Sequence, residues 1–223
     1  MGKIQGVIFD MDGVLVDTER ISFEFWVKSF EKYGYKYSMD IHLSIIGRND
    51  QSIRNILRET FGTDFPLEEI CNYKSESMIN YLLEEGTPLK IGVFELLEFL
   101  RECNYKIAVA TSTHRERAIQ RLESVGIKGK FDGIVCGDEI DHSKPDPEIF
   151  IKAAERLGLQ PKECIVIEDS PAGVEAGYKG GMKVINVPDM KMPDEKMKKQ
   201  ASLICNNLLE VKKYLETKAC SLG

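Results

Sequence analysis

The chain has 223 residues, of which 43% are hydrophobic and 30% are charged. This length suits one large α/β domain, or a core of about 150 residues with a smaller domain attached, and the composition excludes a disordered or fibrous protein. The net charge of -6 argues against a general nucleic-acid binder, which needs clustered Lys and Arg. All apolar runs are far shorter than the ~20 residues that span a bilayer, so we expect no membrane segment.

The start of the chain and its cysteines indicate a cytoplasmic protein. Met1-Gly2-Lys3 leads directly into a β-like segment, without the basic start and long apolar stretch of a signal peptide. The six cysteines are widely spaced and form no Cys-x-x-Cys pair, so we expect reduced thiols. In the absence of any sequence signal for assembly, we expect a monomer.

The first predicted strand is the β-branched run 4–9, which ends in Asp10-Met11-Asp12-Gly13. Glycine permits a sharp turn there, so the strand delivers two carboxylates at its C-terminal end. From Thr18 to about Gly86 the apolar spacing is helical, and no strand is indicated. Three helices are expected in this block, marked by Ile21, Phe25, Phe30 and Tyr33, by Ile53, Ile56 and Leu57, and by Cys71, Met78, Tyr81 and Leu82.

After Gly92, predicted helices alternate with predicted strands. The helices are expected at 94–103, 115–125, 147–157 and 172–177, and the strands at 106–110, 133–136, 164–167, 183–186 and 202–205. Such alternation implies right-handed crossovers and a parallel sheet covered on both faces. The fold class is therefore α/β, with a Rossmann-like, doubly wound parallel sheet and an inserted helical block.

Polar residues follow the predicted strands, at the edge of the sheet where such folds bind ligands. They include Asp10 and Asp12, Thr111-Ser112-Thr113, and Glu168-Asp169. Four carboxylates in one cleft repel one another, so a cation is needed to offset their charge. A donor set made only of oxygen atoms favours Mg2+, which predicts a magnesium site formed by Asp10, Asp12, Glu168 and Asp169.

This arrangement suits attack on a phosphate monoester. Asp10 can attack the phosphoryl group when a metal offsets the repulsion between the two anions, and Asp12 can move protons as general acid and base. Thr111 and Ser112 offer hydroxyl donors and Lys144 a cation, and we assign these three to the substrate phosphate. Singly, each feature has an ordinary explanation as a turn, a helix cap or a solvated loop. Together they favour a functional site, because they occur in one order at the strand ends of a single predicted sheet.

These residues make the chain resemble the haloacid dehalogenase superfamily, in its branch with a helical cap after the first strand. The segment 10–18 resembles the first motif, Thr111 the second, the segment 144–147 the third, and the segment 168–174 the fourth. The resemblance implies a catalytic core at 1–16 and 88–223 and a cap at 17–87. It also implies an aspartyl phosphate on Asp10, with Mg2+ held by Asp10, Asp169 and the backbone carbonyl of Asp12, assisted by Glu168.

Three activities remain open within this resemblance. Dehalogenases lack an acid at the position of Asp12, which argues against them. β-Phosphoglucomutase-like enzymes carry a His near Ser22 and an Arg near Asn49, although Arg48 is one residue away. The run 108–113 resembles phosphatases of phosphorylated sugars, so a small phosphate monoester is the expected substrate and hydrolysis the favoured reaction. A binding or regulatory module that kept the fold and lost turnover is a hypothesis from a different class, beside these three activities.

Several other residues are given ordinary roles. The aromatic residues around Trp26 are expected to pack the cap's own core, because they recur at helical spacing. His42 has no partner at metal spacing and is expected to be a surface or cap residue, and His114 a solvated one. Lys74 is not expected to extend from the cap into the site.

Overall fold

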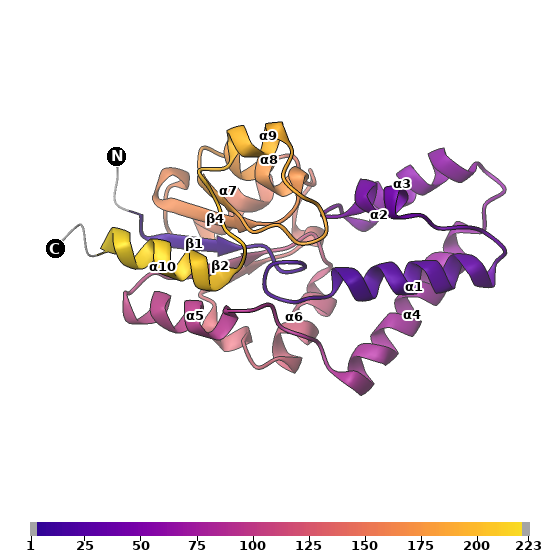
Figure 1. Cartoon of the computed structure of the whole chain (residues 1–223), viewed down its shortest axis with the longest axis horizontal. Helices are drawn as coiled ribbons and strands as arrows, with labels where there is room; N and C mark the ends of the chain where they lie inside the picture. Colours follow the sequence, from indigo (N-terminus) through magenta and orange to yellow (C-terminus); the bar gives the residue numbers. More distant parts are fainter. Residues whose placement is uncertain (1–3, 220–223) are drawn as a thin grey trace.

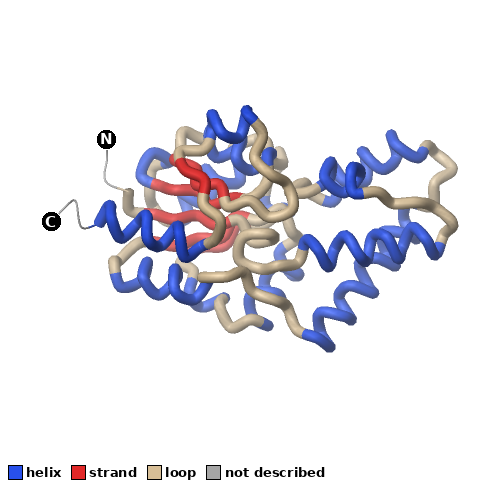
Figure 2. The backbone as a smooth tube through the Cα atoms, in the orientation of Figure 1, coloured by secondary structure: helices blue, strands red, loops and turns tan. Residues whose placement is uncertain are grey.

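The computed structural model describes residues 4–219, so Met1–Lys3 and Cys220–Gly223 lie outside the described part of the chain. All six strands form one parallel sheet in the order β3-β2-β1-β4-β5-β6 (Figure 2). Their bounds are β1 Gly6–Phe9, β2 Lys106–Ala110, β3 Gly133–Val135, β4 Cys164–Glu168, β5 Lys183–Asn186 and β6 Leu203–Ile204. The α/β sheet predicted from the sequence is confirmed, with β1 at its centre.

Helices cover both faces of the sheet because successive strand residues point to opposite sides. Val7 and Phe9 of β1 pack against α5 (Val93–Glu102), α6 (Arg115–Ser124) and α10 (Leu208–Ala219). Ile8 faces α7 (Glu148–Arg156), α8 (Pro171–Lys179) and α9 (Glu195–Gln200). Short 3-10 turns lie at Lys128–Lys130, Gly137–Glu139 and Pro161–Glu163.

Between β1 and α5 the chain forms a separate helical lobe, which extends away from the sheet (Figure 1). It contains α1 (Glu19–Lys32), α2 (Met39–Ile45), α3 (Asp50–Phe61) and α4 (Leu67–Glu85). Trp26 and Phe30 of α1 are buried in a cluster of their own with Tyr37 and Phe65, and the rings of Trp26 and Tyr37 stack 5.7 Å apart. The lobe thus has its own aromatic core, as the spacing around Trp26 predicts.

Two neighbouring segments connect the lobe to the core. Val16 and Leu89 form an antiparallel bridge, and Asp17 N–H donates to the Pro88 carbonyl at 2.9 Å. Lys90 Nζ lies 3.4 Å from Asp17 and 2.9 Å from the buried carboxylate of Asp189, which follows β5. We propose that the boundary between a core of 1–16 and 88–223 and a cap of 17–87 runs through this pair of segments.

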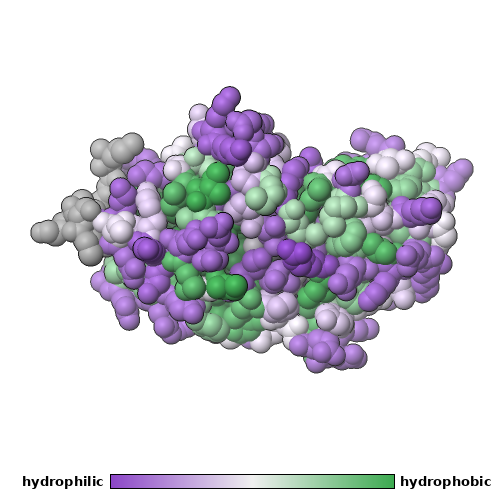
Figure 3. Space-filling view, viewed as in Figure 1, coloured by the Kyte–Doolittle hydropathy of each residue, from purple (hydrophilic) through white to green (hydrophobic). Residues whose placement is uncertain are grey.

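The structure differs from the sequence predictions mainly in short elements. α2, α9 and α10 were not predicted, and β6 is shorter than the expected strand at 202–205. His42 lies in α2 and is 1% exposed, so it is buried inside the cap and not at its surface. Across residues 4–219, no helix is long and apolar enough to cross a bilayer. On the face shown in Figure 3, polar side chains are interspersed with apolar ones over both lobes.

Candidate active site

The turn after β1 brings Asp10 against the end of β4. Asp10 N–H donates to the Ile167 carbonyl at 3.0 Å, so the two strand ends stay in register. Gly13 has a φ of 85°, and a Cβ added there would lie 2.6 Å from Asp169 Oδ2. A side chain at this position would therefore strain the turn and collide with Asp169, which explains the glycine in Asp10-Met11-Asp12-Gly13.

Three carboxylates gather where β1 and β4 end. Oxygen atoms of Asp10, Glu168 and Asp169 lie within 4.8 Å of one another, and all three residues are buried. Burial, together with repulsion from Glu168 and Asp10, raises the pKa of Asp169 well above its usual value. Buried carboxylates at this spacing suit a hard divalent cation, which would offset their mutual repulsion. The residues present therefore fit the metal that the sequence predicts.

Lys144 lies in the core beneath this cluster. Its ammonium is fully buried and donates to Asp10, to Glu168 at 2.9 Å and to the Ala110 carbonyl at 3.3 Å. Burial alone would lower the pKa of Lys144, but the charges of Asp10 and Glu168 raise it above its usual value. Burial also raises the pKa of Asp10, to about 8, against the opposing charge of Lys144. Lys144 is the buried cation that compensates the cluster in this structure.

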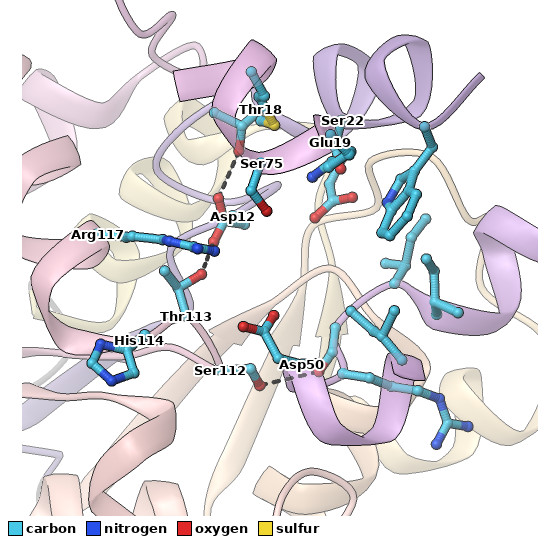
Figure 4. A pocket seen from close by; sticks show the side chains of 18 of the residues that line it. Asp12, Thr18, Glu19, Ser22, Asp50, Ser75, Ser112, Thr113, His114 and Arg117 are labelled. Carbon is cyan, nitrogen blue, oxygen red and sulfur yellow. Dashed lines mark hydrogen bonds between the residues drawn. The ribbon is translucent and has the colours of Figure 1, made fainter. Parts of the chain in front are cut away.

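Asp12 is held apart from the three clustered carboxylates. Its Oδ1 accepts from Thr18 Oγ1 at 2.6 Å and its Oδ2 from Thr113 Oγ1 at 2.8 Å (Figure 4). Asp12 Oδ1 also accepts from Arg121 Nη1 at 2.6 Å. Burial alone would raise the pKa of Asp12, but the Arg121 charge and the two hydroxyl donors outweigh burial and lower it. The two aspartates of the turn thus have different surroundings: Asp10 contacts Lys144 inside the carboxylate cluster, and Asp12 is held by Thr18, Thr113 and Arg121.

Arg121 was missed by the sequence reasoning. It lies on α6, one helical turn beyond Arg117, and both residues line the cavity above the cluster. Residues four apart on a helix share one face, so the pair Arg117 and Arg121 on the helix that follows Thr111 was the available signal.

Thr111 and Ser112 lie at the end of β2, on the cavity floor. Thr111 is 1% exposed, and its hydroxyl accepts from Thr113 N–H at 3.1 Å. Ser112 Oγ donates to the Gly47 carbonyl of the cap at 3.2 Å. Both residues line the cavity together with Asp10 and Asp12, and the Ser112 hydroxyl also joins the core to the cap.

The cavity lies between core and cap. Asp10, Asp12 and residues 111–113 line it from the core, and the cap residues facing them include Glu19, Ser22, Arg48, Asp50 and Lys74 (Figure 4). Lys74 does line the cavity, which was not expected from the sequence. Burial, followed by the Arg121 charge, lowers the pKa of Lys74 to about 8. His114 is 58% exposed at the cavity edge, as expected for a solvated residue.

The parallel sheet, the carboxylates at its strand ends and the helical lobe over them define a capped α/β enzyme of the Rossmann-like class. The family model described as haloacid dehalogenase-like hydrolase matches residues 7–187. The chain belongs to this hydrolase family, and the resemblance seen in the sequence motifs is confirmed.

Relatives with named activities are similar over most of the chain. A phosphorylated carbohydrates phosphatase of Thermotoga maritima is 38% identical over 185 residues, which cover 82% of this chain and 84% of the relative. The fructose-1-phosphate phosphatase YqaB of Escherichia coli is 30% identical and covers 83% of this chain and 97% of its own. The crystal structure of a β-phosphoglucomutase from Clostridium difficile superposes with a TM-score of 0.81 at 26% identity, covering 98% of both chains.

Proposed function

We propose that this enzyme is a magnesium-dependent phosphatase that hydrolyses small phosphorylated sugars through an aspartyl phosphate on Asp10. The observation that carries the proposal is the position of Asp10, which lines the cavity and contacts Lys144 inside a buried carboxylate cluster. The similarity to a phosphorylated carbohydrates phosphatase and to a fructose-1-phosphate phosphatase supports the substrate class.

In the first half of the reaction, Asp10 attacks phosphorus and the bond between phosphorus and the sugar oxygen breaks. Asp12 donates a proton to the departing oxygen, so the sugar leaves as a neutral alcohol. Thr111, Ser112 and Lys144 are the residues proposed to bind the phosphoryl oxygens, and Lys144 also holds Asp10 in place.

In the second half, water attacks the aspartyl phosphate and Asp12 accepts its proton. Phosphate leaves and the Asp10 carboxylate is restored, so the site returns to its starting state. Bound Mg2+ would offset the charge of the phosphoryl group and the carboxylates. Asp10, Asp169, Glu168 and the backbone carbonyl of Asp12 are the groups proposed to hold the ion, and the described cluster of three carboxylates supports this assignment.

The experiment is an assay of phosphate release from fructose 1-phosphate and glucose 6-phosphate, with Mg2+ and after removal of divalent ions by EDTA. We expect turnover that requires the metal, and a loss of about 10³-fold or more in kcat for Asp10→Asn, because the amide cannot attack phosphorus. The Asp10→Asn variant should keep its thermal midpoint within a few degrees, which shows that it is folded. Full activity in Asp10→Asn would contradict the proposed nucleophile.

A phosphosugar mutase is the second candidate, because the β-phosphoglucomutase from Clostridium difficile shares the fold over nearly the whole chain. Ser22 faces the cavity where the mutases resembled by this sequence carry a His, and this argues for hydrolysis. Incubation with β-glucose 1-phosphate and its bisphosphate activator separates the two activities. Glucose 6-phosphate formed without phosphate release would establish the mutase, and no product in either assay would indicate a binding module.

We also infer that the enzyme acts as a monomer in the cytoplasm on a small-molecule ester and not on a nucleic acid. The net charge of -6 supports the last point, since it disfavours a phosphate backbone. Light scattering of the purified protein tests the oligomeric state.

A further inference from the structure

Glu19 is an acidic residue on the cap side of the cavity that the proposed mechanism does not use. It is the first residue of α1, and its carboxylate points into the cavity beside Ser22 (Figure 4). Trp26, two turns further along α1, also lines the cavity. Positions spaced by three, four and seven residues share one helix face, so α1 presents a carboxylate, a hydroxyl and an indole in a row toward the substrate space.

A buried pair of cap residues lies behind Glu19. His42 Nε2 is 3.7 Å from Glu19 Oε2, and Tyr37 Oη is 3.1 Å from His42 Nδ1. His42 Nε2 is buried and has no hydrogen-bond partner among the described residues. Burial lowers the pKa of His42 to about 4, so the imidazole is neutral near pH 7 and supplies no positive charge to Glu19.

The carboxylate oxygens of Glu19 are available to a ligand. Within residues 4–219 no protein group donates a hydrogen bond to either oxygen, although the side chain is only 16% exposed. Burial, followed by the charge of Asp12, raises the pKa of Glu19 to about 7, as expected for a carboxyl group without donors. A partly buried carboxylate without protein donors is stabilised most by hydrogen-bond donors that the substrate supplies.

The chemistry of Glu19 selects hydroxyl groups. The phosphate end of a substrate belongs on the core side, at Asp10 and Thr111, and a second phosphate at Glu19 would be repelled by its charge. Hydroxyl groups donate to a carboxylate, and two neighbouring hydroxyls match its two oxygens. We propose that Glu19 binds hydroxyl groups of the leaving group and selects polyhydroxylated monophosphates over esters without hydroxyls. This inference rests on the proposed phosphatase function.

The test compares two primary alkyl esters that differ in their hydroxyl groups, fructose 1-phosphate and n-hexyl phosphate. The measured quantity is the ratio of kcat/KM for the sugar ester to kcat/KM for the hexyl ester, with Mg2+. Glu19→Ala should lower this ratio about 10- to 100-fold, because the hydroxyls lose a charged acceptor. Glu24→Gln is the matched control, since Glu24 lies on α1 but is exposed and does not line the cavity, and it should keep the wild-type ratio.

Two outcomes would overturn the inference. An unchanged ratio in Glu19→Ala would show that Glu19 does not read hydroxyl groups, and equal losses on both esters would assign it a structural role. Failure of the proposed function looks different, because the wild type would then hydrolyse neither ester. In that event, calorimetry of fructose 1-phosphate binding to the wild type and to Glu19→Ala decides: a Kd raised about 10-fold or more supports hydroxyl recognition, and equal Kd values reject it.

Discussion

Lys144 shows how strongly one residue determines the charge balance of the site. It is fully buried and contacts two buried carboxylates, Asp10 and Glu168, whose charge it offsets in part. A lysine before proline would ordinarily be solvated, so only its resemblance to a family motif and its place in the order of strand ends identified it in the sequence. The structure explains the residue type, because a neutral side chain would leave the two carboxylates uncompensated.

Replacing Lys144 by Met should therefore destabilise the metal-free protein by about 3–5 kcal/mol, the typical effect of breaking a buried ion pair. Urea denaturation in EDTA measures this free energy of unfolding. Added MgCl2 should raise the unfolding midpoint of Lys144→Met more than that of the wild type, since the cation replaces the lost charge. Lys162→Met, at an exposed position, should stay within about 0.5 kcal/mol of the wild type. Equal stability of the two variants would contradict this account.

His42 predicts a pH dependence of stability. The pKa of His42 is about 4 in the folded cap, below the ordinary histidine value of 6.5, so the unfolded chain binds more protons between these two pH values. Its contribution to stability is therefore full above pH 6.5 and is lost as the pH falls toward 4, by up to about 3 kcal/mol. Urea denaturation at pH 7, 6 and 5 should show a steeper loss in the wild type than in His42→Gln. Identical slopes would rule out His42 as the source.

At the scale of elements, most strands and helices were predictable from the sequence, whereas the short helices α2 and α9 and the longer helix α10 were not. β2 and β5 have the predicted bounds, because β-branched residues between turn signals mark strands clearly. α2 has seven residues and α9 has six, too few for a helical period to emerge from the pattern. The start of α2 depends instead on the Ser38 side chain, which accepts from Ile41 N–H at 3.3 Å.

Helix α8 provides a test in which packing opposes helix propensity. A Cβ at Gly173 would lie 1.6 Å from Glu168 Oε1, inside the carboxylate cluster. Alanine favours a helix by about 1 kcal/mol over glycine, yet Gly173→Ala should destabilise the protein by about 1–3 kcal/mol because Glu168 must move. Thermal denaturation measures the change. Gly129→Ala, where a Cβ meets nothing within 4 Å, is the control, and a raised Tm for Gly173→Ala would refute the argument.

At the scale of the whole molecule, the core residues of the candidate site followed from the sequence, whereas its cap residues did not. Parallel strands end at the same edge, so Asp10, Thr111 and Glu168 could be placed together by topology alone. Glu19 and Lys74 depend on how the cap is oriented by the segments around Val16 and Leu89, and no periodicity encodes that orientation. Arg121 likewise contacts Asp12 only when α6 packs onto the sheet.

The position of β1 in the sheet has a consequence for synthesis on the ribosome. Gly6 emerges first, but its partners Lys106 and Cys164 follow about 100 and 158 residues later. At about 5–20 residues per second, the strand that carries Asp10 waits several seconds or more for a neighbour, while the helices of the cap, whose contacts are local, fold in the meantime. Glu168 and Asp169 emerge later still, so a nascent chain assembles the three clustered carboxylates only after residue 169 has been synthesised.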